Sequence, residues 1–158
     1  MELPKRKSIR LKNYDYSQNG AYFITICTHN RECLFVGDDS ISSRMLDDIW
    51  NKTINQYTNV KCSKYIIMPN HFHAIIIIER ADIESAPTIP QIIQSLKRYS
   101  TIEYIKLVNR NLLKPFDKQI WQRSYHDHII RNEQEYQKIW EYIDTNPLRW
   151  ELDCYHTK

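Results

Sequence analysis

The hydrophobic positions of the chain follow two periods, one typical of strands and one typical of helices. Runs of β-branched and aromatic residues predict strands, and apolar residues spaced by three or four positions predict helices. The predicted strands cover residues 21–28, 60–68, 71–79 and 119–125, and the predicted helices cover residues 41–57, about 90–108 and about 132–145. The last strand, "QIWQRSY", is expected at the edge of a sheet.

Local signals support these boundaries. Ser40 is suited to cap the first helix, Pro90 to open the second, and the Asn-Pro pair at 146–147 to end the third. The Pro-Asn pair at 69–70 predicts a hairpin between the second and third strands. The order β-α-β-β-α-β-α predicts an α+β fold of the ferredoxin-like or RRM-like type. We expect one antiparallel sheet with helices on one face, and the other face partly open for a ligand or for the C-terminal helix.

Composition narrows the classes of function. The 158 residues suit a single domain spanning 1–158, and the apolar share of 42% is ordinary. The longest apolar run is far shorter than the ~20 residues of a membrane helix, so no membrane partner is expected. The N-terminus has no secretory signal pattern, and the four cysteines form no CxxC pair, which predicts reduced thiols in a cytoplasmic protein. The chain has only two glycines, and neither lies in a phosphate-binding pattern, so it cannot form a P-loop, a GxGxxG dinucleotide site or a GxSxG nucleophile elbow.

Two histidines are separated by a single residue in the largely apolar segment "YIIMPNHFHAIIII". Because side chains alternate along a strand, His71 and His73 project to one face while Phe72 projects into the core. Such a pair is either hydrogen-bonded within the fold or shares a metal ion. A second pair, His126 and His128, has an aspartate between its members, which cannot anchor a strand in a core. We therefore interpret the second pair as structural.

The last helix supplies a possible partner for the first pair. Its apolar stripe, at helical spacing, is formed by Tyr136, Ile139, Trp140 and Ile143. Tyr142 lies roughly 110° from the centre of that stripe, so packing alone does not account for it. Lys138 lies one turn before Tyr142 and Asn146 one turn after it. A column of a cation, a phenol and a carboxamide is suited to handling a phosphate.

These residues resemble those of a known family. The motif "MPNHFHAI", the opening "RKSIRLKNYDYSQNGAYFITICTHNRECLF" and the closing "WQRSYHDHIIRNEQEYQKIWEYIDTNP" are similar to the HUH-type single-tyrosine, IS200-like transposases, and within them to the REP-associated tyrosine transposases. The resemblance spans about residues 5–150 and is loose over 80–118. It implies that Tyr142 is the nucleophile and that His71 and His73 bind a metal. Asn146 matches the polar residue that completes the metal site, which is a glutamine in many relatives.

The resemblance also implies a reaction, a cofactor and a partner. The tyrosine would attack a phosphodiester of single-stranded DNA, forming a 5′-phosphotyrosine and releasing a 3′-OH that can reverse the attack. Mg²⁺ or Mn²⁺ is the implied ion, although nitrogen-rich ligands suit Mn²⁺, Ni²⁺ or Zn²⁺ at least as well. The implied substrate is single-stranded DNA with a hairpin, and the protein acts as a monomer or as a homodimer. Candidate phosphate contacts are Arg10, Lys12, Lys97, Arg98, Arg123, Arg131 and Lys138, and Tyr14 and Tyr16 could stack on bases.

Three other functions are compatible with parts of the sequence. An RRM-like RNA-binding module shares the fold class, but the chain has no RNP1-type run of glycine and aromatic residues. A protein that binds structured single-stranded DNA without cutting it is the main alternative. A metal-dependent phosphodiesterase in which Tyr142 only packs would form no covalent adduct with DNA.

Overall fold

A computed structural model of the chain describes residues 20–36, 40–79 and 86–152. The strands are β1 (Gly20–Cys27), β2 (Val60–Met68), β3 (His71–Ile78) and β4 (His126–Ile130), and the α-helices are α1 (Ile41–Asn55), α2 (Ile89–Asn109) and α3 (Glu133–Thr145). Two short 3-10 segments follow β1 and α3, η1 (His29–Arg31) and η2 (Pro147–Leu152). The observed order of strands and α-helices is the predicted one.

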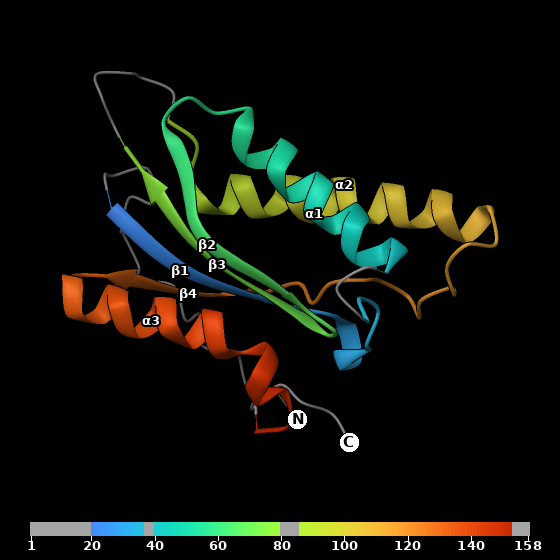
Figure 1. The fold of residues 1–158 in the computed structure, drawn as a ribbon. Coiled ribbons are helices and arrows are strands. Elements are labelled where there is room, and N and C mark those ends of the chain that lie inside the picture. Colours follow the sequence, from blue (N-terminus) through green and yellow to red (C-terminus); the bar gives the residue numbers. More distant parts are fainter. Residues whose placement is uncertain (1–19, 37–39, 80–85, 153–158) are drawn as a thin grey trace, which may run out of the picture.

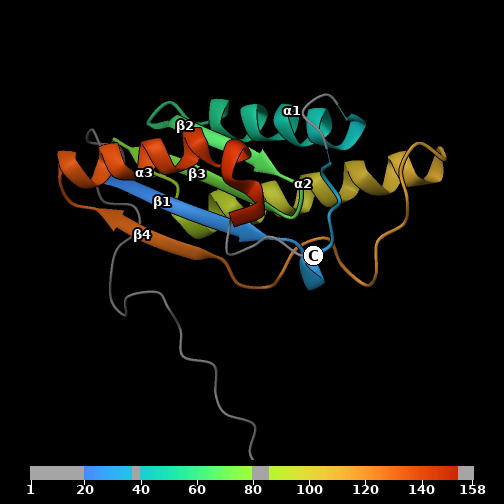
Figure 2. The same ribbon diagram turned by 60° about the horizontal axis from the view of Figure 1, so that its bottom comes forward.

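The four strands form one antiparallel sheet in the order β2-β3-β1-β4. Helices α1 and α2 cover one face of the sheet, and α3 lies against the opposite face (Figures 1 and 2). This is the α+β, ferredoxin-like arrangement predicted from the sequence. The C-terminal helix covers the face that was expected to be open either for a ligand or for that helix.

Side-chain hydrogen bonds determine where the helices begin. Ser40 accepts a hydrogen bond from the backbone N–H of Ser43 at the start of α1, as predicted. Thr88 and Gln91 form a reciprocal capping box at the start of α2, with Pro90 in the first turn. Asn132 accepts from a backbone N–H of the first turn of α3. These caps satisfy donors that have no partner within the helix.

The core is divided between the two faces of the sheet. Phe72 and the other even-numbered residues of β3 pack under α1 and α2 in the larger cluster. Ile75 packs with Ile130 and Ile143 beneath α3 in a much smaller one. Helix α3 has a single buried residue, Ile143, and its predicted apolar stripe faces the sheet. The helix that carries Tyr142 is therefore the most lightly packed of the three α-helices in the described part of the chain.

An irregularity in β2 changes which face its residues present. The register of the β2–β3 pair shifts between Cys62 and Lys64. An extra residue in one strand reverses the alternation of side chains beyond it. Cys62 and Tyr65 consequently both pack toward the larger cluster, whereas Lys64 reaches across to α3.

The prediction of an edge strand at residues 119–125 is wrong, because the strand that follows α2 at one edge of the sheet is β4, at His126–Ile130. Within 119–125, Trp121 forms only an isolated bridge with Thr28. The Lys97 ammonium of α2 donates to the carbonyls of residues 122, 123 and 124 at 2.7, 3.3 and 3.4 Å. These carbonyls thus bond to a side chain, while the apolar residues of the segment are buried in the larger cluster.

Two further expectations concern the thiols and the membrane. Cys27, Cys33 and Cys62 form no disulfide within the described residues, and Cys154 lies outside them. In the same part of the chain, no helix combines the length and apolarity needed to cross a membrane.

Candidate functional site

His71 and His73 lie next to each other on the face of the sheet that α3 covers. They belong to β3, where the odd-numbered residues face α3 and the even-numbered ones face the main core. Their exposed fractions are 0% and 1%, and their ring centroids are 4.6 Å apart. Both imidazoles are thus removed from solvent and project to the same side, as the alternation predicted.

Each imidazole is held through its Nδ1 atom. The Oγ1 atom of Thr25 on β1 lies 2.8 Å from Nδ1 of His73. The Oδ1 atom of Asn70, in the turn between β2 and β3, lies 2.8 Å from Nδ1 of His71. Partners at Nδ1 orient the rings so that the Nε2 atoms are the ones available to a site.

Two aromatic rings pack against the histidines. Phe23 of β1 stacks on His73 with centroids 5.3 Å apart. Trp150 of η2 stacks on His71 with centroids 5.8 Å apart. The imidazole pair is therefore enclosed by rings that come from both ends of the described chain.

Tyr142 brings its phenol to this pair. Its Oη atom lies 3.5 Å from Nε2 of His73, and the two rings meet edge to face with centroids 5.3 Å apart. The rings of Phe23 and Tyr142 also meet edge to face, with centroids 6.2 Å apart. Tyr142 is 40% exposed, so its hydroxyl lies at the boundary between the buried histidines and solvent. Residues 71, 73 and 142, grouped by sequence reasoning, are thus adjacent in the fold.

Asn146 follows one turn later, at the C-cap of α3, and is 2% exposed. Its Oδ1 atom is buried and has no hydrogen-bond partner among the described residues. A buried acceptor of this kind is costly unless it has a partner, and a cation would satisfy it. Two imidazoles and an amide oxygen are suitable ligands for a divalent ion of the first transition series. The described residues contain no group of three or more His, Cys, Asp or Glu side chains that could hold a metal ion.

Burial also determines the charge of His73. Desolvation, reinforced by the neighbouring His71, lowers the pKa of His73 well below its ordinary value of 6.5. His73 is therefore neutral near pH 7, which is the form of imidazole that can bind a metal.

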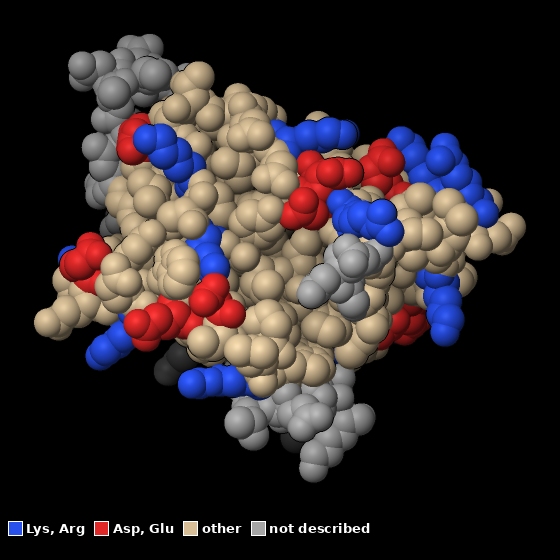
Figure 3. All heavy atoms as spheres, viewed as in Figure 1, with Lys and Arg blue, Asp and Glu red and all other residues tan. Residues whose placement is uncertain are grey.

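The basic residues proposed for DNA binding are scattered. Arg10 and Lys12, like Tyr14 and Tyr16, lie outside the described residues. On the face seen in Figure 3, the described residues interleave basic and acidic side chains and form no continuous basic surface. Lys97, Arg98 and Arg123 instead line a groove of about 660 Å³ between α2 and the segment before β4, together with Lys118. Among the residues that the structure describes, no acidic residue lines this groove.

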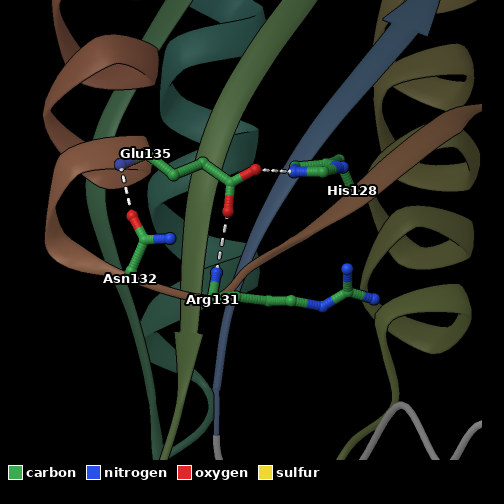
Figure 4. Close-up of polar contacts among 4 residues, drawn as sticks. All are labelled: His128, Arg131, Asn132 and Glu135. Atoms are coloured by element: carbon green, nitrogen blue, oxygen red, sulfur yellow. Dashed lines mark hydrogen bonds and ion pairs between the residues drawn. The ribbon is translucent and has the colours of Figure 1, made fainter.

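The remaining two basic candidates lie near or on α3, and both are exposed. Glu135 of α3 accepts a hydrogen bond from the backbone N–H of Arg131 and contacts Nε2 of His128, while the Arg131 guanidinium extends away from these contacts (Figure 4). His128 is therefore part of the junction between β4 and α3, in agreement with a structural role for the second histidine pair. Lys138 lies on the exposed surface of α3.

Four residues of the site were not singled out from the sequence: Phe23, Thr25, Asn70 and Trp150. Their contact with the histidines follows from strand register, a hairpin turn and the path of η2. Only Asn70, which is adjacent to His71 in the sequence, carried a local signal of proximity.

The chain is similar to known proteins in sequence and in fold. The family model described as "Transposase IS200 like" matches residues 16–146. An uncharacterized protein of Haemophilus influenzae is 38% identical over 168 residues, covering 94% of this chain and 91% of that protein. A second Haemophilus influenzae protein, provisionally named a REP-associated tyrosine transposase, is 26% identical and covers 88% of this chain and 77% of that protein.

Two solved structures share the fold. A REP-associated tyrosine transposase bound to a REP hairpin has a TM-score of 0.62 at 22% identity, covering 89% of this chain and 74% of that chain. A protein of Deinococcus radiodurans, provisionally described as a transposase, has a TM-score of 0.55 at 19% identity, covering 86% and 95%. At these identities the likeness concerns the fold.

Proposed function

The chain belongs to the family of IS200-like transposases, and on this premise we propose that it cuts and rejoins single-stranded DNA with Tyr142 as nucleophile. One observation carries the proposal: the phenol oxygen of Tyr142 lies 3.5 Å from Nε2 of His73, beside a second buried imidazole. A tyrosine that only packs would not need to face this pair with its hydroxyl.

The reaction is a transesterification at a phosphodiester. The Tyr142 oxygen forms a bond to phosphorus, the bond from phosphorus to the 3′ oxygen breaks, and the 3′ oxygen leaves and takes up a proton from solvent. The phenolic proton goes to water, which reaches Tyr142 because that residue is 40% exposed. The product is a 5′-phosphotyrosine. Since a phenol is a better leaving group than an aliphatic alcohol, a 3′-OH can reverse the step without added energy.

His71, His73 and Asn146 would hold a divalent ion, Mg²⁺ or Mn²⁺. The support is the two imidazoles held through Nδ1 and the buried Oδ1 atom of Asn146. When bound, the ion supplies positive charge that polarises the scissile phosphate and stabilises the transition state. Neutral imidazoles leave that charge uncompensated, which suits an anionic substrate.

The substrate we propose is single-stranded DNA that contains a hairpin. The structure with TM-score 0.62 is that of a relative bound to a REP hairpin. In this chain, the groove lined by Lys97, Arg98, Lys118 and Arg123 suits a phosphate backbone by its charge. Lys97 contributes its charge while its ammonium donates to loop carbonyls, so Arg98 and Arg123, which are exposed, are the stronger candidates for direct contact. A DNA substrate is consistent with activity in the cytoplasm.

A covalent adduct is the decisive test. The protein is incubated with hairpin-bearing single-stranded DNA and Mn²⁺ or Mg²⁺, and tryptic peptides are searched by mass spectrometry for a nucleotide on Tyr142. Tyr142→Phe should retain DNA binding and lose both the adduct and nicking. Tyr136→Phe is a matched control, because that tyrosine lies in the apolar stripe of the same helix.

The other outcomes identify the alternatives. Cleavage products without an adduct would mean a metal-dependent phosphodiesterase in which Tyr142 only packs. Binding with neither cleavage nor adduct would mean a protein that recognises structured DNA without cutting it.

A further inference from the structure

Asn70 is held from several sides in the turn between β2 and β3. It is 1% exposed. Its backbone carbonyl accepts hydrogen bonds from the N–H and the Oγ1 of Thr28 at 2.9 and 3.0 Å. Its side-chain Nδ2 donates to the carbonyl of Arg31 at 3.4 Å. Its Oδ1 lies 2.8 Å from Nδ1 of His71. The side chain is thus fixed between η1 and the histidine.

The donors and acceptors around Asn70 determine which atom of its side-chain amide, Oδ1 or Nδ2, faces His71. A carbonyl only accepts hydrogen bonds, so the atom of Asn70 that faces the Arg31 carbonyl must be the NH₂ group. The opposite orientation would place two acceptors against each other. The Oδ1 atom therefore faces His71, and because Oδ1 can only accept, Nδ1 of His71 must carry the proton.

The turn that presents the Arg31 carbonyl has an unusual backbone. Asn30 and Arg31 both have positive φ angles, 52° and 53°. Residues other than glycine seldom adopt this conformation. Two such residues in succession, in η1, direct a main-chain acceptor toward Asn70. The orientation of the amide therefore depends on backbone geometry and does not rest on a rotatable hydroxyl.

We propose that Asn70 is the positioning residue of His71: it holds the imidazole in the Nδ1–H tautomer, so that the lone pair is on Nε2, where it can bind a metal ion. The second half of this statement rests on the proposed function, in which Nε2 binds a metal ion. At His73, the Nδ1 atom lies 2.8 Å from the hydroxyl of Thr25, which can donate or accept, and the ring also has a hydrogen bond with the Ile24 backbone.

The tautomer can be measured without any metal. Long-range ¹H–¹⁵N spectra separate the protonated from the bare nitrogen of a neutral imidazole, and the spectrum of a His71→Gln variant assigns the signals. We expect Nδ1–H in the wild-type protein and in Asn70→Asp, which keeps the acceptor. We expect Nε2–H, or exchange between the two forms, in Asn70→Ala. Asn59→Ala is the matched control, since Asn59 adjoins the far end of β2 and contacts neither histidine in any hydrogen bond we find among the described residues.

Metal binding is the second readout. Titration with Mn²⁺, followed by calorimetry and electron paramagnetic resonance, should give a dissociation constant roughly 10–100-fold weaker for Asn70→Ala, the loss typical of a residue that orients a metal ligand. Asn59→Ala should stay near the wild-type value.

The two proposals fail in different ways. A wild-type protein with Nε2–H on His71, or an Asn70→Ala variant that keeps Nδ1–H, overturns the role of Asn70 whatever the metal does. A wild-type protein that has Nδ1–H but neither binds Mn²⁺ nor forms a DNA adduct overturns the proposed function and leaves the tautomer selection by Asn70 supported. Should Asn70→Ala fail to fold, the wild-type tautomer and Asn70→Asp still decide.

Discussion

Lys64 offers a quantitative test of how the helix that carries Tyr142 is held on the sheet. Its ammonium lies 2.6 Å from the carboxylate of Asp144 and 4.1 Å from the ring centroid of Trp140, both on α3. The side chain of Lys64 is 24% exposed and that of Asp144 is 50% exposed. One lysine thus connects β2 to two residues of a helix that buries a single side chain.

The two contacts should contribute unequally to the free energy of unfolding. An ion pair with one half-exposed partner contributes about 0.2–1 kcal/mol. A cation over a tryptophan face contributes about 0.5–2 kcal/mol, more as the cation is desolvated. Lys64→Ala should therefore lower the free energy of unfolding by about 0.7–3 kcal/mol, and Asp144→Ala by about 0.2–1 kcal/mol. The coupling of Lys64 to Trp140 should exceed its coupling to Asp144.

Double-mutant cycles measured by urea unfolding test this order. The cycles use Lys64→Ala with Asp144→Ala, and Lys64→Ala with Trp140→Leu. Between about 0.05 and 0.5 M NaCl, screening should reduce the coupling to Asp144 more than the coupling to Trp140. Lys61→Ala is the control, because its ion pair with Glu79 is 64% and 57% exposed and should be nearly neutral. The reasoning is refuted if the coupling to Asp144 is the larger, or if Lys64→Ala costs no more than Asp144→Ala.

Three further changes test other parts of the molecule. Asn146→Ala should weaken Mn²⁺ binding in calorimetry yet, in EDTA, change the free energy of unfolding by less than about 1 kcal/mol, because the lost Oδ1 has no hydrogen bond within the described chain; a large loss in EDTA would contradict this. Hydrogen bonds from the backbone N–H of Arg131 and then from His128 lower the pKa of Glu135 below 4.5. The contribution of Glu135 to stability is therefore complete above pH 4.5 and is lost as the pH falls through the pKa of the folded state. Glu135→Gln should flatten that acid limb in urea titrations, and an unchanged limb would argue against it. Burial raises the pKa of Cys62 to about 11, so iodoacetamide at about pH 8 should label the exposed Cys33 well before Cys62; equal rates in peptide mass spectrometry would count against this prediction.

Much of the fold could be predicted because its signals are local. Periodicity distinguishes strand from helix, and the Ser40 cap and the 69–70 hairpin act through residues a few positions away. The edge strand was placed wrongly because its partners are remote. Residues 119–125 have a strand-like composition, but the ammonium of Lys97 donates hydrogen bonds to the carbonyls of residues 122, 123 and 124. No feature within the segment indicates that a side chain of α2 binds these carbonyls in place of a neighbouring strand.

In the candidate site too, the features with local signals could be predicted and those set by remote contacts could not. The shared face of His71 and His73 follows from strand alternation, and the displacement of Tyr142 from the apolar stripe follows from helical spacing. The residues that hold the imidazoles could not be found in this way. Thr25 reaches His73 through the register of β1 against β3, and Trp150 reaches His71 through the path of the chain after α3.

The amino-acid sequence by itself determined the element types, the family resemblance and the identity of the three side chains that meet in the site. Those properties depend on residue chemistry and on periods of two or about four positions. Only the tertiary structure decided that the Tyr142 hydroxyl faces Nε2 of His73, that a bulge turns Lys64 toward α3, and that Asn70 holds His71. Each of these depends on strand register or on the seating of one element against another, and both result from packing free energy summed over the whole domain.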